Sequence, residues 1–360
     1  MAQAPEELID IATRHQVYLE RLKTGEANKA DEFLKSLNTT ITGRLAGRDL
    51  TTFSRDRLNQ LLFSVRSDLN ILANDFTSEV SSQAIDLADY ESGFERKSLG
   101  QIIQTDFNIP TAAALEFAVF NNPLTMVGAD NGKLLKPFIK DMSKKTLDRV
   151  AGAISAGYYE GQSTNQILQN IRGTRAQKYT NGILYQVNST AKTITRTALQ
   201  HAAVQAREQV WQDNSDIIKG VQWVSTLDSR TSATCRSLDG TVYPVDKGPR
   251  PPIHPNCRST MAPVLDRRFK SLEQGATRSA RGEGGVTSVA ADQTYYGWLK
   301  KQPASFQNNA IGKTKGTLLR RGGLSSEKFA ELQLGKNFKP MTLQQMKEIE
   351  PTAFEKANLT

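Results

Sequence analysis

The chain has 360 residues, of which 46 are basic and 37 are acidic, and it carries a formal net charge of +9. No apolar run approaches the ~20 residues of a membrane span, and the first residues lack the apolar core of a secretory signal. Two cysteines in a chain long enough for two domains make no disulfide framework, so we expect a soluble protein made in a reducing cytosol.

The apolar periodicity of residues 1–105 predicts an N-terminal helical region. Apolar residues recur at helical spacing from Leu8 to Leu45 and, after a short break, from Leu58 towards Phe94. Helices of this kind are not stable alone, so their apolar stripes favour a helical bundle or a helical arm. The stripes could instead dock on another chain, but packing into a core is the commoner use of this pattern.

A connector is expected over residues 106–142. Pro110, Pro123 and Pro137 mark loops there, and a short alanine-rich helix is predicted at 112–120.

The central domain is expected over residues 143–268. One helical face precedes Gly157, and Ser163 and Gln166 have the spacing of a capping box that opens a second helix. A third helix is predicted from about residue 189 to 212. His201 lies among alanines in that helix, which favours a packed or surface histidine over a metal ligand.

Small strands are expected beside these helices. Residues 221–225 alternate between apolar and polar side chains, and residues 241–243 resemble their hairpin partner. The sequence therefore predicts an α+β, predominantly α-helical protein. Its parts are an N-terminal helical bundle or arm, a small central α+β domain with a Cys/His loop region, and an extended basic C-terminal tail.

Both cysteines and one of the three histidines lie close together, with the spacing Cys235-x18-His254-x2-Cys257. Turn-forming residues crowd this interval, and zinc prefers thiolate and imidazole ligands in a tetrahedron. Asp228 and Asp239 are candidates for a fourth ligand, and Asp228 is preferred because it directly follows the strand-like run. Alternatively, the cysteines are small buried hydrophobic residues and His254 caps a turn.

Motifs for catalysis are missing around this spacing. The chain has no His-Glu-x-x-His, no Gly-x-Ser-x-Gly elbow and no Walker loop, and no glutamate stands beside His254. A bound zinc is therefore expected to be structural, holding together a loop-rich region with little apolar core of its own.

The same segment resembles a known family. The residues that carry the resemblance are Asp228-Ser229-Arg230-Thr231, Cys235, Leu238-Asp239-Gly240 and the run from Pro251 to Arg258 that includes His254-Pro255-Asn256-Cys257. They look like the signature of phage head morphogenesis proteins, the family of the phage Mu and SPP1 minor head proteins. The run 191–198 is similar to the helix that leads into that domain. The resemblance covers about residues 145–265 and implies a virion protein present in few copies near the portal vertex.

Positive charge is concentrated in the last third of the chain. Residues 247–281 hold eight basic and two acidic side chains, and residues 299–326 hold six basic and none that are acidic. Such stretches attract polyanions. They also suit a solvated surface or an acidic partner. Residues 269–292 are expected to be a linker and residues 293–360 the basic tail, in which Thr342 is expected to cap a short helix. The candidate nucleic-acid contacts are Arg267, Arg268, Lys270, Arg320 and Arg321.

These observations favour a minor head protein over an enzyme. The resemblance implies that it joins portal protein, other capsid or ejected proteins and packaged double-stranded DNA, in the virion and, during assembly, in the host cytoplasm. Its action would be in head assembly, DNA packaging or genome delivery. The alternative is a metal-dependent enzyme acting on nucleic acid, or a toxin-like transferase using Arg320, Ser325, Ser326 and Glu327. A general DNA-binding protein is a third possibility, and it requires an affinity that falls steeply with salt.

Overall fold

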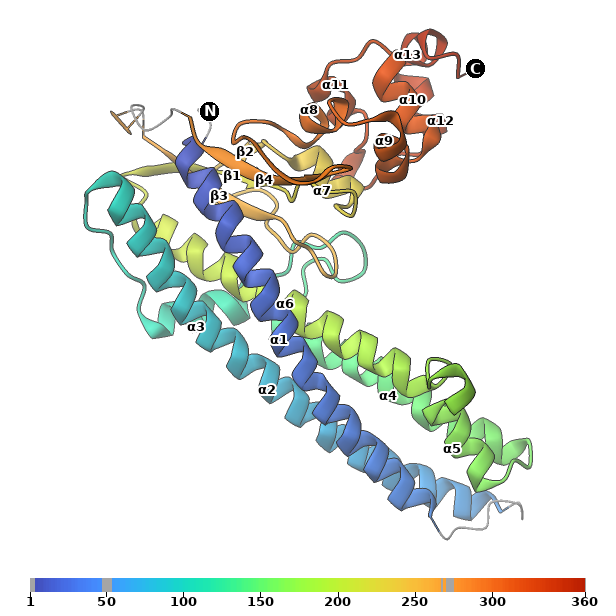
Figure 1. Cartoon of the computed structure of the whole chain (residues 1–360). Helices are drawn as coiled ribbons and strands as arrows, with labels where there is room; N and C mark the ends of the chain where they lie inside the picture. Colours follow the sequence, from blue (N-terminus) through green and yellow to red (C-terminus); the bar gives the residue numbers. More distant parts are fainter. Residues whose placement is uncertain (1–3, 47–53, 267, 270–274, 360) are drawn as a thin grey trace.

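The computed structural model describes residues 4–46, 54–266, 268–269 and 275–359. Four long helices lie side by side as an elongated arm (Figure 1), which confirms the predicted helical region. Helix α6 packs against each of the other three. The four helices are α1 (Glu6–Leu45), α2 (Arg55–Ile103), α4 (Leu135–Tyr159) and α6 (Ile183–Asp213).

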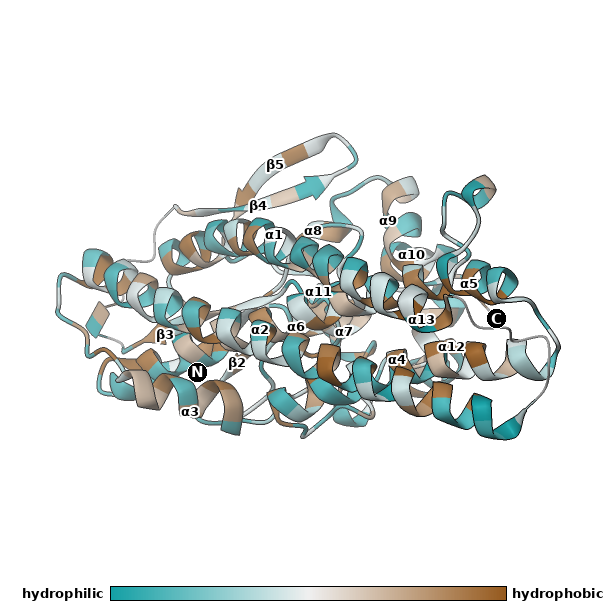
Figure 2. Ribbon diagram, turned by 90° about the horizontal axis from the view of Figure 1, so that it is seen from below, coloured by the Kyte–Doolittle hydropathy of each residue, from teal (hydrophilic) through white to brown (hydrophobic). Residues whose placement is uncertain are grey.

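The apolar stripes of the long helices face one another. Hydrophilic and hydrophobic residues alternate along their ribbons in Figure 2, as expected when one face of a helix is buried. One buried cluster of the arm contains Phe76 and Phe138, and a second contains Leu37, Leu61 and Ile154. Each such side chain contributes about 1.5–3 kcal/mol when it is fully buried. The stripes therefore serve the core of the arm.

Short helices join the long ones. Helix α3 (Ala112–Asn121) was predicted, and α5 (Thr164–Arg172) begins with the predicted capping box of Ser163 and Gln166. Helix α4 begins earlier than predicted, at Leu135, and includes Pro137. Proline is tolerated there because the first turn of a helix does not use its backbone N–H groups. The expected boundary at residue 143 thus falls inside a continuous helix.

A three-stranded antiparallel sheet follows the arm. It has the order β2-β1-β3, formed by β2 (Val242–Tyr243), β1 (Ile218–Val224) and β3 (Thr260–Leu265). Val221 lies opposite Tyr243, so the predicted hairpin pairing is confirmed. Strand β3 was not predicted, because Pro263 interrupts its pattern. Strand β3 lies at the edge of the sheet, and proline is tolerated in an edge strand because its missing N–H can face away from the neighbouring strand.

Residues 277–290, expected to lie within a linker, form a second, two-stranded sheet. Strands β4 (Thr277–Gly282) and β5 (Gly285–Ala290) pair in antiparallel register, with Gly282 opposite Gly285. Gly285 has a φ of +103°, a conformation that glycine adopts readily. Gly282, Gly284 and Gly285 therefore form the tight turn of this hairpin.

The C-terminal residues fold as a compact cluster of helices rather than as an extended tail (Figure 1). Trp298, Phe329 and Phe354 are buried together in it. Thr342 caps α12 as predicted, with Gln345 completing a capping box. The helices are α8 (Tyr295–Lys300), α9 (Ala304–Ile311), α10 (Lys313–Arg321), α11 (Ser326–Glu331), α12 (Leu343–Ile349) and α13 (Pro351–Lys356).

The first turns of α1 join the arm to the sheet. Ile9 packs in one apolar cluster with Val224 of β1 and Val264 of β3. The backbone N–H of Ala4 donates to Oε1 of Gln222 at 2.8 Å, and the N–H of Ala276 donates to a carboxylate oxygen of Glu6 at 2.9 Å. Within the described ranges, no helix has both the length and the apolar character needed to cross a membrane.

Candidate metal centre

The sheet brings the two halves of the Cys/His motif together. Val224, at the end of β1, lies opposite Thr260, at the start of β3. The segment that leaves β1 and the segment that enters β3 therefore lie at the same end of the sheet. The first leads to α7 (Ala233–Leu238), which carries Cys235, and the second carries His254 and Cys257.

Cys235 lies in the first turn of α7. The hydroxyl of Ser232 accepts a hydrogen bond from the backbone N–H of Cys235 at 3.2 Å and so caps this helix. Cys257 follows a turn in which its own N–H donates to the carbonyl of His254 at 3.2 Å. Both cysteines are buried and His254 is partly buried.

The three side chains form one group whose ligand atoms lie within 4.8 Å of one another. The Sγ atoms of Cys235 and Cys257 are 3.7 Å apart, and Nε2 of His254 lies 3.2 Å from Sγ of Cys235. Two thiolates at the ~2.3 Å Zn–S distance of a tetrahedral site stand about 3.8 Å apart. The sulfur separation therefore fits a tetrahedral metal ion. The group can hold a metal.

The tautomer of His254 also fits a ligand role. Its Nδ1 lies 2.9 Å from the carbonyl oxygen of Pro255. A carbonyl oxygen only accepts hydrogen bonds, so Nδ1 carries the proton and neutral His254 keeps its lone pair on Nε2. A metal-bound histidine is commonly oriented in this way by a backbone carbonyl.

Helix α6 supports the loop that carries His254 and Cys257. The backbone N–H of Asn256 donates to Oγ1 of Thr197, and its side-chain amide donates to Oγ1 of Thr193, both at 3.2 Å. Asn256 has a φ of +56°, which asparagine tolerates better than most residues. The run 191–198, singled out in the sequence as a leading helix, thus lies directly beneath the site.

The ionisation of the three groups is coupled. Burial and the neighbouring Cys257 raise the pKa of Cys235 well above its ordinary value. Burial also opposes ionisation of Cys257, but its interactions with Cys235 and His254 outweigh that effect and lower the pKa of Cys257. Burial would lower the pKa of His254, yet its interaction with the Cys257 thiolate raises it. Of the two cysteines, Cys257 is therefore the one that ionises more readily.

The structure does not bring Asp228 to these ligands. Its carboxylate receives two hydrogen bonds from the guanidinium of Arg258, at 2.6 and 2.8 Å, and the backbone N–H groups of Arg230 and Thr231 donate to it at 3.0 Å. Burial raises the pKa of Asp228, but Arg258 outweighs that effect and keeps it below its ordinary value. The preferred fourth ligand is thus a carboxylate that positions Arg258.

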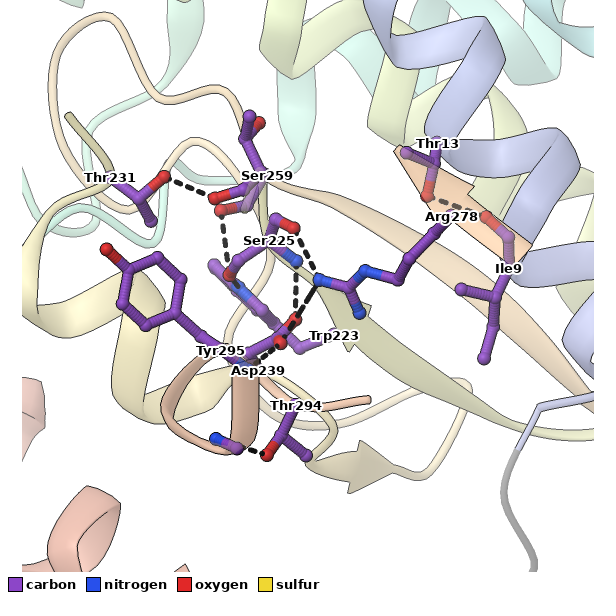
Figure 3. A network of polar contacts seen from close by, with 12 residues as sticks. Ile9, Thr13, Trp223, Ser225, Thr231, Asp239, Ser259, Arg278, Thr294 and Tyr295 are labelled. Atoms are coloured by element: carbon purple, nitrogen blue, oxygen red, sulfur yellow. Dashed lines mark hydrogen bonds and ion pairs between the residues drawn. The ribbon is translucent and has the colours of Figure 1, made fainter. Parts of the chain in front are cut away.

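Asp239, the other candidate ligand, is also engaged elsewhere. Its carboxylate lies 3.1 Å from Nη2 of Arg278 and accepts hydrogen bonds from the backbone N–H groups of Ser225 and Tyr295, both at 2.7 Å (Figure 3). Among the described residues, the metal group therefore has three members, and neither aspartate is one of them.

His201 is a packed core residue, as the sequence favoured. It is buried in α6 and its Nε2 lies 3.1 Å from the carbonyl oxygen of Val119. Sequence reasoning overlooked Lys23, whose Nζ is buried and lies 3.4 Å from the carbonyl oxygen of Cys257. A lysine on the apolar face of α1, four residues after the buried Leu19, was the signal that could have identified it.

The predicted nucleic-acid contacts belong to separate elements. Arg267 and Lys270 lie outside the described residues. Arg268 follows β3 and pairs with Asp266 at 3.0 Å, whereas Arg320 and Arg321 are exposed in the last turn of α10. Arg320 donates hydrogen bonds to the side-chain oxygens of Gln307 and Asn308.

Comparison with known proteins gives two matches. Residues 145–262 match the family described as Phage Mu protein F like protein. The minor head protein GP7 of Bacillus phage SPP1 is 25% identical over an alignment of 214 residues, which covers 55% of this chain and 63% of that protein. The chain thus spans less than two thirds of the length of this curated relative. No solved structure gives a significant match.

Proposed function

We propose that this chain, in which residues 145–262 match the phage Mu protein F-like family, is a minor head protein that acts in phage head assembly. The main support for the proposal is the position of the family match within the chain. It runs from α4 to β3 and so includes α6, the sheet and all three members of the Cys/His group. The relative that is 25% identical to this chain is itself named a minor head protein.

At a finer level, we propose a place inside the head or at the portal vertex. The partners would be the portal protein and other capsid or ejected proteins, and the protein would act in DNA packaging or genome delivery. Contact with packaged double-stranded DNA would use Arg268, Arg320 and Arg321, together with Arg267 and Lys270. The exposure of Arg320 and Arg321 at the end of α10 supports this role.

We further propose that Cys235, His254 and Cys257 hold a structural zinc ion. Zinc supplies a rigid cross-link between its ligands when it is bound. Here it would tie the segment that leaves β1 to the segment that enters β3. The sulfur separation and the tautomer of His254 support this assignment.

A metal-dependent enzyme or a toxin-like transferase is the competing function. Three protein ligands with one position left for water is also the layout of catalytic zinc sites. Such a site needs a general base, and the carboxylates of Asp228 and Asp239 are both held by arginines. Cleavage of plasmid DNA by the metal-loaded protein, abolished by His254→Ala, would favour the enzyme.

The test of the main proposal is made in the phage that encodes the chain. We expect the protein in purified virions at few copies per head, and we expect the portal protein to be recovered with it by chemical cross-linking. Cys257→Ser should reduce its incorporation into heads at unchanged expression, whereas Ser237→Ala, on the same short helix as Cys235, should not. Heads that lack the protein but retain full infectivity would contradict the assignment.

A further inference from the structure

A cleft of about 760 Å³ opens beside the Cys/His group. One wall is α1, and the others are α6, the loops at the ends of β1 and β3, and the hairpin of β4 and β5. Asn256 and Arg258, which flank Cys257 in the chain, both line it. The volume lies within the ~300–1,000 Å³ range of ordinary ligand sites.

The lining of the cleft carries an excess of positive charge. Six of its side chains are basic and two are acidic. Both acids already have partners, because Glu20 pairs with Lys23 at 2.6 Å and Asp228 with Arg258 at 2.6 Å. Their charges are therefore not available to the other basic residues.

Three arginines of the lining are left without an acidic partner. Within the described part of the chain, Arg21 of α1, Arg196 of α6 and Arg281 of β4 form no ion pair. Arg230, a fourth, lies 3.8 Å from the carboxylate that Arg258 already occupies. Segments far apart in the sequence thus place unneutralised guanidinium groups around one cavity.

Like charges around one cavity repel one another in the free protein, and a bound anion would relieve that repulsion. Planar guanidinium groups suit carboxylates and phosphates, to which they donate paired hydrogen bonds.

The side chains that line the cleft favour one class of anion over others. Among the described residues, no aromatic side chain and no histidine lines the cleft. Sites for single-stranded nucleic acid depend on aromatic side chains on which the bases stack, and a duplex is too wide for a cavity of this volume. The three arginines without an acidic partner carry more positive charge than a single phosphate neutralises. An extended polypeptide with several carboxylates needs no aromatic side chains for stacking, is narrower than a duplex, and carries several negative charges.

We propose that this cleft binds an extended, acidic polypeptide segment of another protein, rich in aspartate and glutamate. Arg196, Arg281 and Arg21 contact its carboxylates, and the hydroxyl and amide groups of the lining contact its backbone. This binding site is distinct from the metal centre and from the basic residues predicted at 267–270 and 320–321. It stands independently of the role in head assembly.

The experiment is fluorescence anisotropy of labelled decaglutamate titrated with the full chain at low salt. We expect saturable binding, with decaglutamine binding much more weakly. Arg196→Gln/Arg281→Gln should weaken decaglutamate binding about tenfold or more, the loss expected for two ion pairs. Thr24→Glu, which adds a negative charge to the lining without removing an arginine, should weaken it in the same direction.

The matched control is Arg57→Gln/Arg66→Gln, which removes the same charge from two exposed positions of α2 outside the cleft. It should leave the affinity within about twofold. Equal losses in the cleft and control variants would overturn the proposal, because only net charge would then matter. It would also be overturned by equal binding of decaglutamine, or by a single-stranded oligonucleotide that binds more tightly than decaglutamate through the same arginines.

Discussion

The guanidinium of Arg278 and the carboxylate of Asp239 form an ion pair at 3.1 Å in which the two side chains are only 2% and 0% exposed. Arg278 lies on β4, Asp239 follows α7, and the same carboxylate accepts the backbone N–H of Tyr295 at the start of α8. Burial raises the pKa of Asp239 in spite of Arg278. The pair thus connects three elements at a considerable desolvation cost.

We expect Asp239→Ala to lower the free energy of unfolding by about 3–5 kcal/mol, because Arg278 would remain buried without a counter-charge. The C-terminal cluster should also become more sensitive to limited proteolysis. Urea denaturation and a protease time course measure the two effects. Asp246→Ala, an exposed position in the next loop, is the control, and a similar loss in that variant would show that the ion pair is not the cause.

A second buried ion pair connects the arm to the sheet. Glu95 of α2 accepts from Nε of Arg207 at 2.7 Å and from Nε1 of Trp211 at 2.6 Å. Arg207 also donates to Oγ1 of Thr260 and to the carbonyl of Met261. Glu95→Ala should cost about 3–5 kcal/mol of unfolding free energy, measured by urea denaturation.

Glu95→Leu/Arg207→Met should recover a large part of that loss, because it removes both charges and fills the space with apolar atoms. Glu79→Ala, at an exposed position of the same helix, should change stability by no more than about 0.5 kcal/mol. If the double variant were less stable than Glu95→Ala, the predicted charge effect would be wrong.

His201 should make stability depend on pH. Burial lowers its pKa from 6.5 to about 4. In the unfolded chain His201 takes up a proton near pH 6.5, whereas in the folded chain it does so only near pH 4. Neutral His201 therefore contributes fully to the free energy of unfolding above pH 6.5, and this contribution is lost as the pH falls towards 4. The shift corresponds to about 3 kcal/mol.

The measurement compares unfolding free energies of wild type and His201→Gln at pH 7.5 and at successively lower pH. We expect the wild type to lose more stability than the variant on acidification, because glutamine does not titrate. Identical losses in the two proteins would show that His201 is not the titrating group.

Metal content tests the Cys/His group. We expect about one zinc per wild-type chain by elemental analysis, and none in Cys235→Ser/Cys257→Ser. The variant should also melt at a lower temperature, because zinc binding adds to the free energy of folding. His201→Gln should keep its zinc, since His201 lies outside the group. An unchanged melt together with a zinc-free wild type would end the metal assignment.

Zinc affinity should fall as the pH falls. Burial and the neighbouring Cys257 raise the pKa of Cys235 well above its ordinary value, so metal binding at neutral pH must displace the proton of its thiol. Each proton released weakens binding about tenfold per pH unit below the pKa. Competition with a chelator across a range of pH measures this slope. A flat profile would mean that Cys235 is not a ligand.

Local patterns made part of the fold predictable from the sequence. The apolar periodicity of α1 and α2 and the capping boxes at Ser163 and Thr342 depend on residues a few positions apart. The proximity of Cys235 to His254 and Cys257 could be inferred because turn-forming residues fill the interval. The spacing could not settle the role of Asp228, since its partner Arg258 lies 30 positions away.

Elements that depend on distant partners could not be predicted. Strand β3 contains a proline and exists because β1 pairs with it, and the hairpin of β4 and β5 had a glycine-rich sequence typical of a linker. The charge count located basic stretches in the last third of the chain. The cleft instead draws Arg21 and Arg196 from the helical arm, which no local charge count could reveal.

The docking of the first turns of α1 sets an order of events during synthesis. Glu6 bonds to the backbone of Ala276, and Ile9 packs on strands that end at residue 265. At the ~5–20 residues per second of translation, roughly 15–55 s separate the synthesis of Glu6 from that of Ala276. The rest of α1 can pair with α2 and α6 meanwhile. The apolar face around Ile9 therefore gains its partners on β3 only after residue 265 has been synthesised.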